Sequence, residues 1–189
     1  MNPVGLIYAL VCIIAAIIGI AYMRCFFKRL SCLVKISSVC RRYGLTLSVK
    51  HPLWFLGSRY ARRCDLIIQG AQEAFGVKLF GCLWPLKILI LREYGEYVFR
   101  GFSTYLKFII NFIDSWPHPL PQYKFALRRA NLPEDTPLRP ILLVNPMPMA
   151  IHLQPNNGQE EISGTGDHIC GMEIASLSHL LRLLENAKG

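Results

Sequence analysis

The feature that most constrains this chain is an uncharged run of twenty residues, Val4–Met23, followed by a strongly basic stretch. The first 64 residues contain ten Lys and Arg and no Asp or Glu. The remaining residues contain eleven basic and twelve acidic side chains, so the formal charge of +9 divides into +10 and −1. An excess in this position is typical of a membrane anchor with a basic segment beside it.

The length of the run predicts a single transmembrane helix over residues 1–23, of the signal-anchor type. At about 1.5 Å per residue, twenty helical residues cover the roughly 30 Å hydrocarbon core of a bilayer. Tyr8 and Tyr22 lie near its two ends, where interfacial aromatic residues are common. A cleavable signal peptide is the alternative, although no basic residue precedes the run and Met23-Arg24-Cys25 is a poor cleavage site.

The side on which the charge lies predicts the topology. Because the basic residues follow the span, we expect the N-terminus outside and the C-terminal domain in the cytoplasm. Seven cysteines without framework spacing agree with a reducing compartment. Small residues four apart, at Gly5 and Ala9 and again at Ala15 and Gly19, could let two such helices pair as a homodimer.

Residues 24–44 form a second segment, a basic amphipathic juxtamembrane helix that ends near Gly44. Two interpretations stay open. The helix lies on anionic lipid headgroups, or it is the first core-packing helix of the domain with Phe26, Leu30, Leu33 and Ser37 on its inner face. Its expected membrane-surface residues are Arg24, Lys28, Arg29, Lys35, Arg41 and Arg42. Nucleic acid is not an expected partner, because no nucleic-acid-binding motif accompanies the charge.

Residues 45–189 are long enough for one domain. Strands are predicted over Cys64–Gln69, Ala74–Phe80, Arg139–Val144 and His168–Ile174, and Lys87–Arg100 is predicted as a second hairpin. A last helix over Ser176–Ala187 has Ser176 as its N-cap. Phe102–Ile113 is a buried apolar helix or strand, and the proline-rich segment Trp116–Pro140 is a connection. The predicted fold is therefore α+β (mixed α/β): a transmembrane helix, then a small domain whose mixed sheet of four to six strands is flanked by helices.

A helix followed by a hairpin, with Asp65 opening one strand and Lys78 on the next, resembles the restriction-endonuclease-like fold of Mrr-type and nuclease-associated proteins. The resemblance covers roughly residues 28–113. It implies that Asp65 and a second acidic residue bind Mg²⁺ while Lys78 activates water. The second acidic position, two before Lys78, is Gly76, so Glu73 would have to reach in from the turn. On a regular strand Glu73 faces away from Lys78.

Two other motifs contain residues typical of binding sites. The sequence Gly164-Thr-Gly-Asp-His168 contains glycines as phosphate loops do, but it lacks the full pattern and precedes a strand, so a turn is the preferred interpretation. His168, Cys170 and Glu173 could suggest a metal cluster. In one continuous strand only the first two share a face, and zinc needs at least three ligands.

No motif provides a complete set of catalytic groups. We therefore expect a single-pass membrane protein whose cytoplasmic domain has a non-enzymatic interaction or scaffold role, with the lipid bilayer as one partner, an unidentified protein as another, and no cofactor. The alternative is a divergent metal-dependent nuclease that uses Asp65, Glu73 and Lys78 with Mg²⁺.

Overall fold

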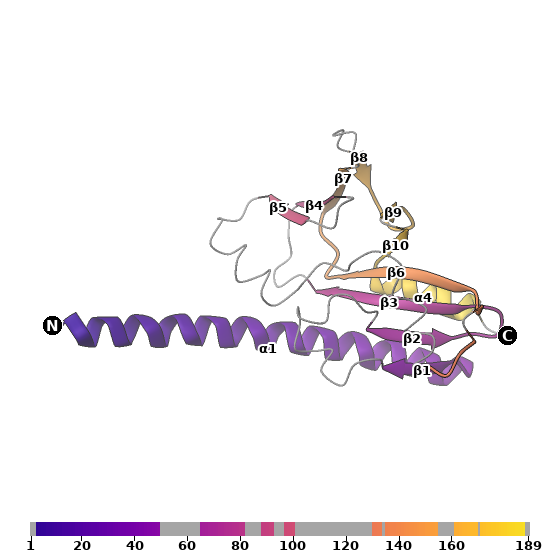
Figure 1. Cartoon of the computed structure of the whole chain (residues 1–189), viewed down its shortest axis with the longest axis horizontal. Helices are drawn as coiled ribbons and strands as arrows, with labels where there is room; N and C mark the ends of the chain where they lie inside the picture. Colours follow the sequence, from indigo (N-terminus) through magenta and orange to yellow (C-terminus); the bar gives the residue numbers. More distant parts are fainter. Residues whose placement is uncertain are drawn as a thin grey trace.

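The computed structural model describes residues 3–49, 65–81, 88–92, 97–100, 130–133, 135–154, 161–169 and 171–187. A single helix, α1 (Pro3–Tyr43), contains both N-terminal segments and stops at Gly44, whose φ of +71° suits a helix C-terminus. Its N-terminal half projects away from the rest of the molecule (Figure 1). Among the described residues, no helix is both long and apolar enough to cross a membrane, so the predicted span is not supported by the structure.

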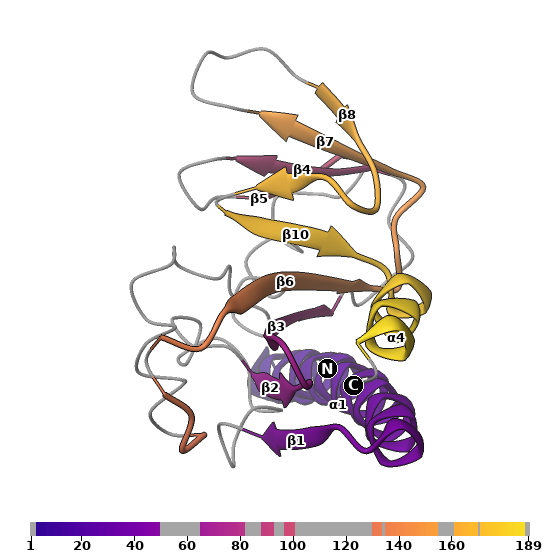
Figure 2. The ribbon, with the colours of Figure 1, turned by 90° about the vertical axis from the view of Figure 1, so that its right-hand side faces the viewer.

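Two β-sheets and a C-terminal helix follow α1 in the described fold. The larger has the order β1-β2-β3-β6-β10-β9, with β1 (Thr46–Val49), β2 (Leu66–Gln69), β3 (Ala74–Gly81), β6 (Leu138–Asn145), β9 (His168–Ile169) and β10 (Met172–Ala175). The smaller has the order β5-β4-β7-β8, with β4 (Ile88–Arg92), β5 (Tyr97–Arg100), β7 (Ala150–Gln154) and β8 (Glu161–Ser163). Figure 2 shows the two sheets one above the other.

A parallel strand pair runs through the centre of the larger sheet. β3 and β6 pair in register from Ala74↔Leu138 to Gly81↔Asn145. The next strand after each of them, β4 after β3 and β7 after β6, belongs to the smaller sheet, where β4 and β7 also pair in parallel. Ile141, Leu142, Leu143 and Val144 of β6 are all fully buried, as expected for an interior strand covered on both faces.

Two helices pack against one face of the larger sheet. They are the C-terminal half of α1 and α4 (Leu177–Asn186), whose buried residues are Leu180 and Leu184. Ser176 caps α4, because its hydroxyl accepts a hydrogen bond from the His179 amide at 3.2 Å. Cys32, Ile36 and Cys40 of α1, each four residues apart, lie in the same core cluster. Their burial supports the core-packing interpretation of this segment.

The inner face of α1 agrees with the expected one at Leu33, which packs against the core cluster, but differs from it elsewhere. Cys32 and Ile36 are buried, whereas Leu30 of the predicted face is 37% exposed. Arg29, expected at a membrane surface, is buried at 5% exposure, while Arg24, Lys35, Arg41 and Arg42 are exposed and Lys28 is half-buried. The sequence pattern misplaced this face because cysteine and the stem of arginine were not counted as core-forming groups.

The order helix, strands, helix is confirmed, as is the mixed α+β class. The strand predictions for β2, β3, β6 and the β4–β5 hairpin are confirmed within about two residues. The expected single sheet of four to six strands is wrong, since the described residues alone form ten strands in two sheets. The expected strand His168–Ile174 is a hairpin, because Gly171 adopts φ +72° between β9 and β10. The predictions for Phe102–Ile113 and for most of Trp116–Pro140 lie outside the described residues.

Ile36→Ala tests whether α1 belongs to the domain core. Ile36 is fully buried, so we expect a loss of about 2–5 kcal/mol in the free energy of unfolding. Val34→Ala is the matched control on the same helix, because Val34 is 60% exposed and its truncation should change stability by less than about 0.5 kcal/mol. Urea unfolding of the full chain measures both, and equal losses would contradict this packing.

Candidate functional site

The three residues proposed from the nuclease resemblance do not come together. Asp65 directly precedes β2 and lies opposite Lys78 of β3, with Lys78 Nζ 3.3 Å from Asp65 Oδ1. Glu73 lies at the other end of the hairpin, where its Oε1 is 3.9 Å from Arg139 Nη1. Glu73 therefore does not provide the second carboxylate of the metal-binding alternative, and Gly76 has no side chain that could.

The Asp65–Lys78 pair is already satisfied by its own surroundings. The two side chains are only 10% and 9% exposed, and Asp65 Oδ2 also accepts a hydrogen bond from the Leu79 amide at 2.8 Å. A buried charge of this kind requires a partner, and each provides one for the other. This arrangement joins β2 to β3 and leaves Asp65 Oδ1 directed at an ammonium group instead of a metal.

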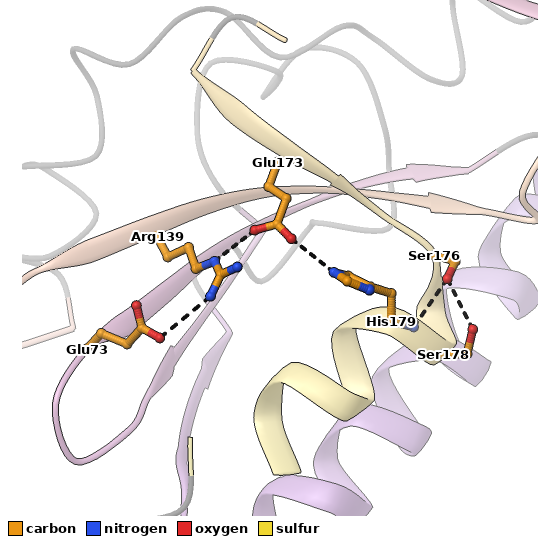
Figure 3. Close-up of polar contacts among 6 residues, drawn as sticks. All are labelled: Glu73, Arg139, Glu173, Ser176, Ser178 and His179. Atoms are coloured by element: carbon orange, nitrogen blue, oxygen red, sulfur yellow. Dashed lines mark hydrogen bonds and ion pairs between the residues drawn. The ribbon is translucent and has the colours of Figure 1, made fainter. Parts of the chain in front are cut away.

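A second polar network lies on the helix-covered side of the sheet (Figure 3). It links four residues from different parts of the fold: Glu73 of the β2–β3 turn, Arg139 of β6, Glu173 of β10 and His179 of α4. At its centre is Glu173 of β10, which is 3% exposed. Its Oε2 accepts from Arg139 Nε at 2.7 Å, and its Oε1 lies 2.9 Å from His179 Nε2. Arg139 extends the network to Glu73 in the β2–β3 turn.

The protein surroundings hold Glu173 in its ionised form. Burial alone raises the pKa of its carboxyl, but hydrogen bonds from His179 and Arg139, together with their charges, lower the pKa below its ordinary value. With Glu173 ionised, His179 Nε2 must donate the proton in their hydrogen bond. The imidazole is therefore fixed in one orientation at the start of α4.

The network contains no assembled nucleophile. The hydroxyl of Ser176 accepts from the backbone amide of His179 and lies 3.1 Å from the hydroxyl of Ser178, so it caps the helix. Burial raises the pKa of the Cys40 thiol to about 11 and also raises that of Cys32, which contacts Asn145 Nδ2 at 2.8 Å. These two cysteines therefore act as small core residues and not as thiolates.

The glycine-rich segment before β9 forms a turn whose amides are bonded within the chain. Asp167 Oδ2 accepts from the Gly164 amide at 2.7 Å and from the Ser163 hydroxyl at 2.8 Å, and these bonds lower the pKa of Asp167. The Gly164 amide is therefore already bonded to a carboxylate within the turn. The turn links the two sheets, since β8 and β9 belong to different ones.

Residues 168–173 do not form a metal centre in the part of the chain that is described. His168 lies opposite Glu173 across the β9–β10 hairpin, so the two share a face, contrary to the prediction for a continuous strand. Glu173 is nevertheless bonded to Arg139 and His179, and no group of three potential ligands occurs among the described residues. Cys170 lies outside those residues.

Comparisons of the chain with protein-family models, with curated proteins and with solved structures gave no significant match. The restriction-endonuclease resemblance therefore stays a prediction. Interpretation of the site depends on its own geometry: two separate charged clusters on the two faces of one sheet, in each of which the buried carboxylate is paired with a basic side chain.

Sequence reasoning did not identify Arg139 or His179 as functional residues. One signal was available, since Glu173 is a charged residue within the apolar strand Met172–Ala175 and such a residue needs a partner when buried. The identity of that partner depends on the parallel pairing of β10 with β6, which sequence patterns do not specify.

Glu173→Gln should lower the free energy of unfolding by about 1–3 kcal/mol at neutral pH, because Arg139 and His179 lose an ionised acceptor. The folded pKa of Glu173 lies below its ordinary value of 4.5, so its stabilising effect is present above that pH and disappears as the pH falls. The difference in the free energy of unfolding between wild type and Glu173→Gln should therefore become smaller below about pH 4.5. Urea unfolding at several pH values measures it, with the more exposed Glu73→Gln as control, and a difference independent of pH would contradict the ionised state.

A double-mutant cycle tests the structural role of the buried ion pair. We expect Asp65→Ala to cost about 3–5 kcal/mol, because it leaves the Lys78 ammonium buried without its carboxylate. Adding Lys78→Met should recover part of that loss, giving a coupling energy of about 1–3 kcal/mol. Urea unfolding of the two single variants and the double variant provides the numbers. Strictly additive losses would show that the two groups do not depend on each other.

Proposed function

We propose that this protein is a membrane-anchored, non-enzymatic interaction module, with the N-terminal half of α1 in the lipid bilayer and the sheets at its cytoplasmic surface. One observation carries the proposal: the N-terminal half of α1 is apolar and exposed, yet it belongs to the same helix as the core-packed half. Its exposed apolar residues are Val4, Leu6, Ile7, Tyr8, Leu10, Val11, Ile13, Ile14, Ile17, Ile20 and Met23.

The extent of this surface requires a covering environment. These side chains are 47–69% exposed, and they cover all sides of the helix, with no polar stripe among them. Burying one such aliphatic side chain is worth about 1.5–3 kcal/mol. A helix that is apolar on every side is typical of a hydrocarbon environment, whereas docking on another protein or lying flat on a membrane requires only one apolar face.

The rigid geometry of α1 refines the role expected for the basic residues. Along the helix axis, Arg24 and Lys28 lie within about 8 Å of Met23, but Lys35 lies about 18 Å and Arg41 about 27 Å beyond it. The Debye length at physiological salt is about 8 Å. With the helix upright in the membrane, Arg24 and Lys28 are therefore the residues that interact with anionic headgroups, while Lys35, Arg41 and Arg42 remain beyond their reach.

The non-enzymatic part of the proposal is supported by the way in which buried charges are used. Asp65 is paired with Lys78, and Glu173 with Arg139 and His179, so these groups stabilise the fold. A homodimer through Gly5 and Gly19 remains a prediction. A Cβ atom at either position would meet nothing within 4 Å in this chain, so that side of the helix is open to a second copy.

The anchoring proposal is tested with Ile14→Arg, which places a charge at the centre of the apolar run. We expect wild-type protein to remain in the membrane pellet after alkaline carbonate and to require detergent for release. The arginine costs about 2.5–3.5 kcal/mol at a bilayer centre, so the variant should leave the pellet. Val34→Arg is the matched control on the exposed surface of the same helix and should remain membrane-bound.

Two outcomes would contradict the anchoring proposal. One is release of the wild-type protein by carbonate, and the other is a discrete oligomer without detergent, in which copies of α1 bury one another. Topology is read from Thr165→Cys, an exposed position after β8. Compared with wild type, the variant should gain labelling by an impermeant thiol reagent only after cells are opened.

A further inference from the structure

A polar pocket of about 340 Å³ lies between the β2–β3 turn, the start of β6 and the end of α4. It is lined by Ala71, Gln72, Glu73, Arg139, Leu183, Asn186 and Ala187. This volume lies at the lower end of the range for ligand sites, so the pocket suits a small molecule.

Arg139 presents a positioned positive group to this pocket. Its Nε is bonded to the buried carboxylate of Glu173 at 2.7 Å, which fixes the plane of the guanidinium group. Its side chain is still 39% exposed. A guanidinium held in this way can bind a carboxylate with little loss of side-chain freedom.

Glu73 provides a negative group beside the positive one. Its Oε1 lies 3.9 Å from Arg139 Nη1, which is too long for a hydrogen bond, and its side chain is 37% exposed (Figure 3). The two charges are therefore adjacent without fully satisfying each other. A ligand carrying both signs of charge on neighbouring atoms complements this pair, whereas a simple anion is repelled by Glu73.

The end of α4 adds a second preference for a positive ligand group. The C-terminal end of a helix carries a partial negative charge, and the last turn of α4 contains no basic residue to neutralise it. Asn186 and Ala187 at this end line the same pocket as Glu73. Cationic groups are therefore favoured on the Glu73 side of the pocket and anionic groups on the Arg139 side.

The remaining lining includes the apolar side chains of Ala71, Leu183 and Ala187. We infer that this pocket binds a free α-amino acid with an aliphatic side chain. The carboxylate of the amino acid accepts hydrogen bonds from Arg139. Its ammonium group donates to Glu73 and lies near the C-terminal end of α4, and its side chain contacts Leu183 and the two alanines.

The position of the pocket indicates the source of the ligand. The end of α4 and the β2–β3 turn lie at the end of the molecule opposite the N-terminus (Figure 1). A ligand therefore enters from the aqueous phase and not from lipid headgroups near Met23. The inference does not depend on membrane anchoring, because every lining residue belongs to the sheet, its turn or α4.

The test compares three probes that differ by one charged group each: L-leucine, isocaproate, which lacks the amine, and isoamylamine, which lacks the carboxylate. The ¹⁵N-labelled full chain in detergent micelles is titrated with each, and the amide shifts of Ala71, Gln72, Glu73 and Asn186 are followed. We expect saturable shifts of these amides with leucine, and at least about tenfold weaker binding of either analogue because each loses a charged hydrogen bond.

Two variants separate ligand binding from folding. Glu73→Gln leaves the bonds of Glu173 intact and should weaken leucine binding about tenfold, while Glu161→Gln, an exposed change on β8, should leave it unchanged. Arg139→Gln should abolish leucine binding, and its thermal midpoint shows whether it is still folded. Equal shifts with isocaproate or isoamylamine, absence of shifts with leucine, or unchanged binding by Glu73→Gln would each overturn the inference.

Discussion

The parallel pairing of β3 with β6 is the constraint on which the rest of this structure depends. Eight residues of each strand pair in register. Of all the paired strands in the larger sheet, these two are separated by the longest stretch of chain. The buried side chains of these strands provide the surface on which α1 and α4 pack. β4 follows β3 and β7 follows β6 along the chain, so the central parallel pair of the smaller sheet comes directly after that of the larger one.

The same pairing explains why two sets of charged residues can be buried in a small domain. Lys78 lies on β3, Arg139 on β6, and Glu173 on β10 beside β6. Because successive side chains on a strand alternate between faces, the Asp65–Lys78 pair and the Arg139–Glu173 network are separated by the sheet. The buried carboxylates of Asp65 and Glu173 are each paired with a basic side chain of their own cluster, so neither is left buried without a partner.

Much of the local structure was predictable from sequence because it depends on local chemistry. Ser176 caps a helix with leucines on one face, and four consecutive aliphatic residues at Ile141 form an interior strand. Long-range pairing was not predictable. The next strand after β6, β7 (Ala150–Gln154), joins a different sheet, and the short strands β1 and β8 lacked the length or the alternation to be recognised. Of the candidate site, the adjacency of Asp65 and Lys78 followed from the hairpin, but Arg139 and His179 required the crossover from β6 to β10.

Because α1 is one continuous helix, it couples the rotation of its apolar half to the rotation of the sheets, as well as joining the two parts. A helix without interruption transmits rotation as well as position, because each residue adds about 100° of turn along with its rise. The number of residues between the apolar half of α1 and Cys32, where core packing begins, thus sets the orientation of the sheets about the helix axis. Any event that turns the apolar half about its axis would turn both sheets through the same angle.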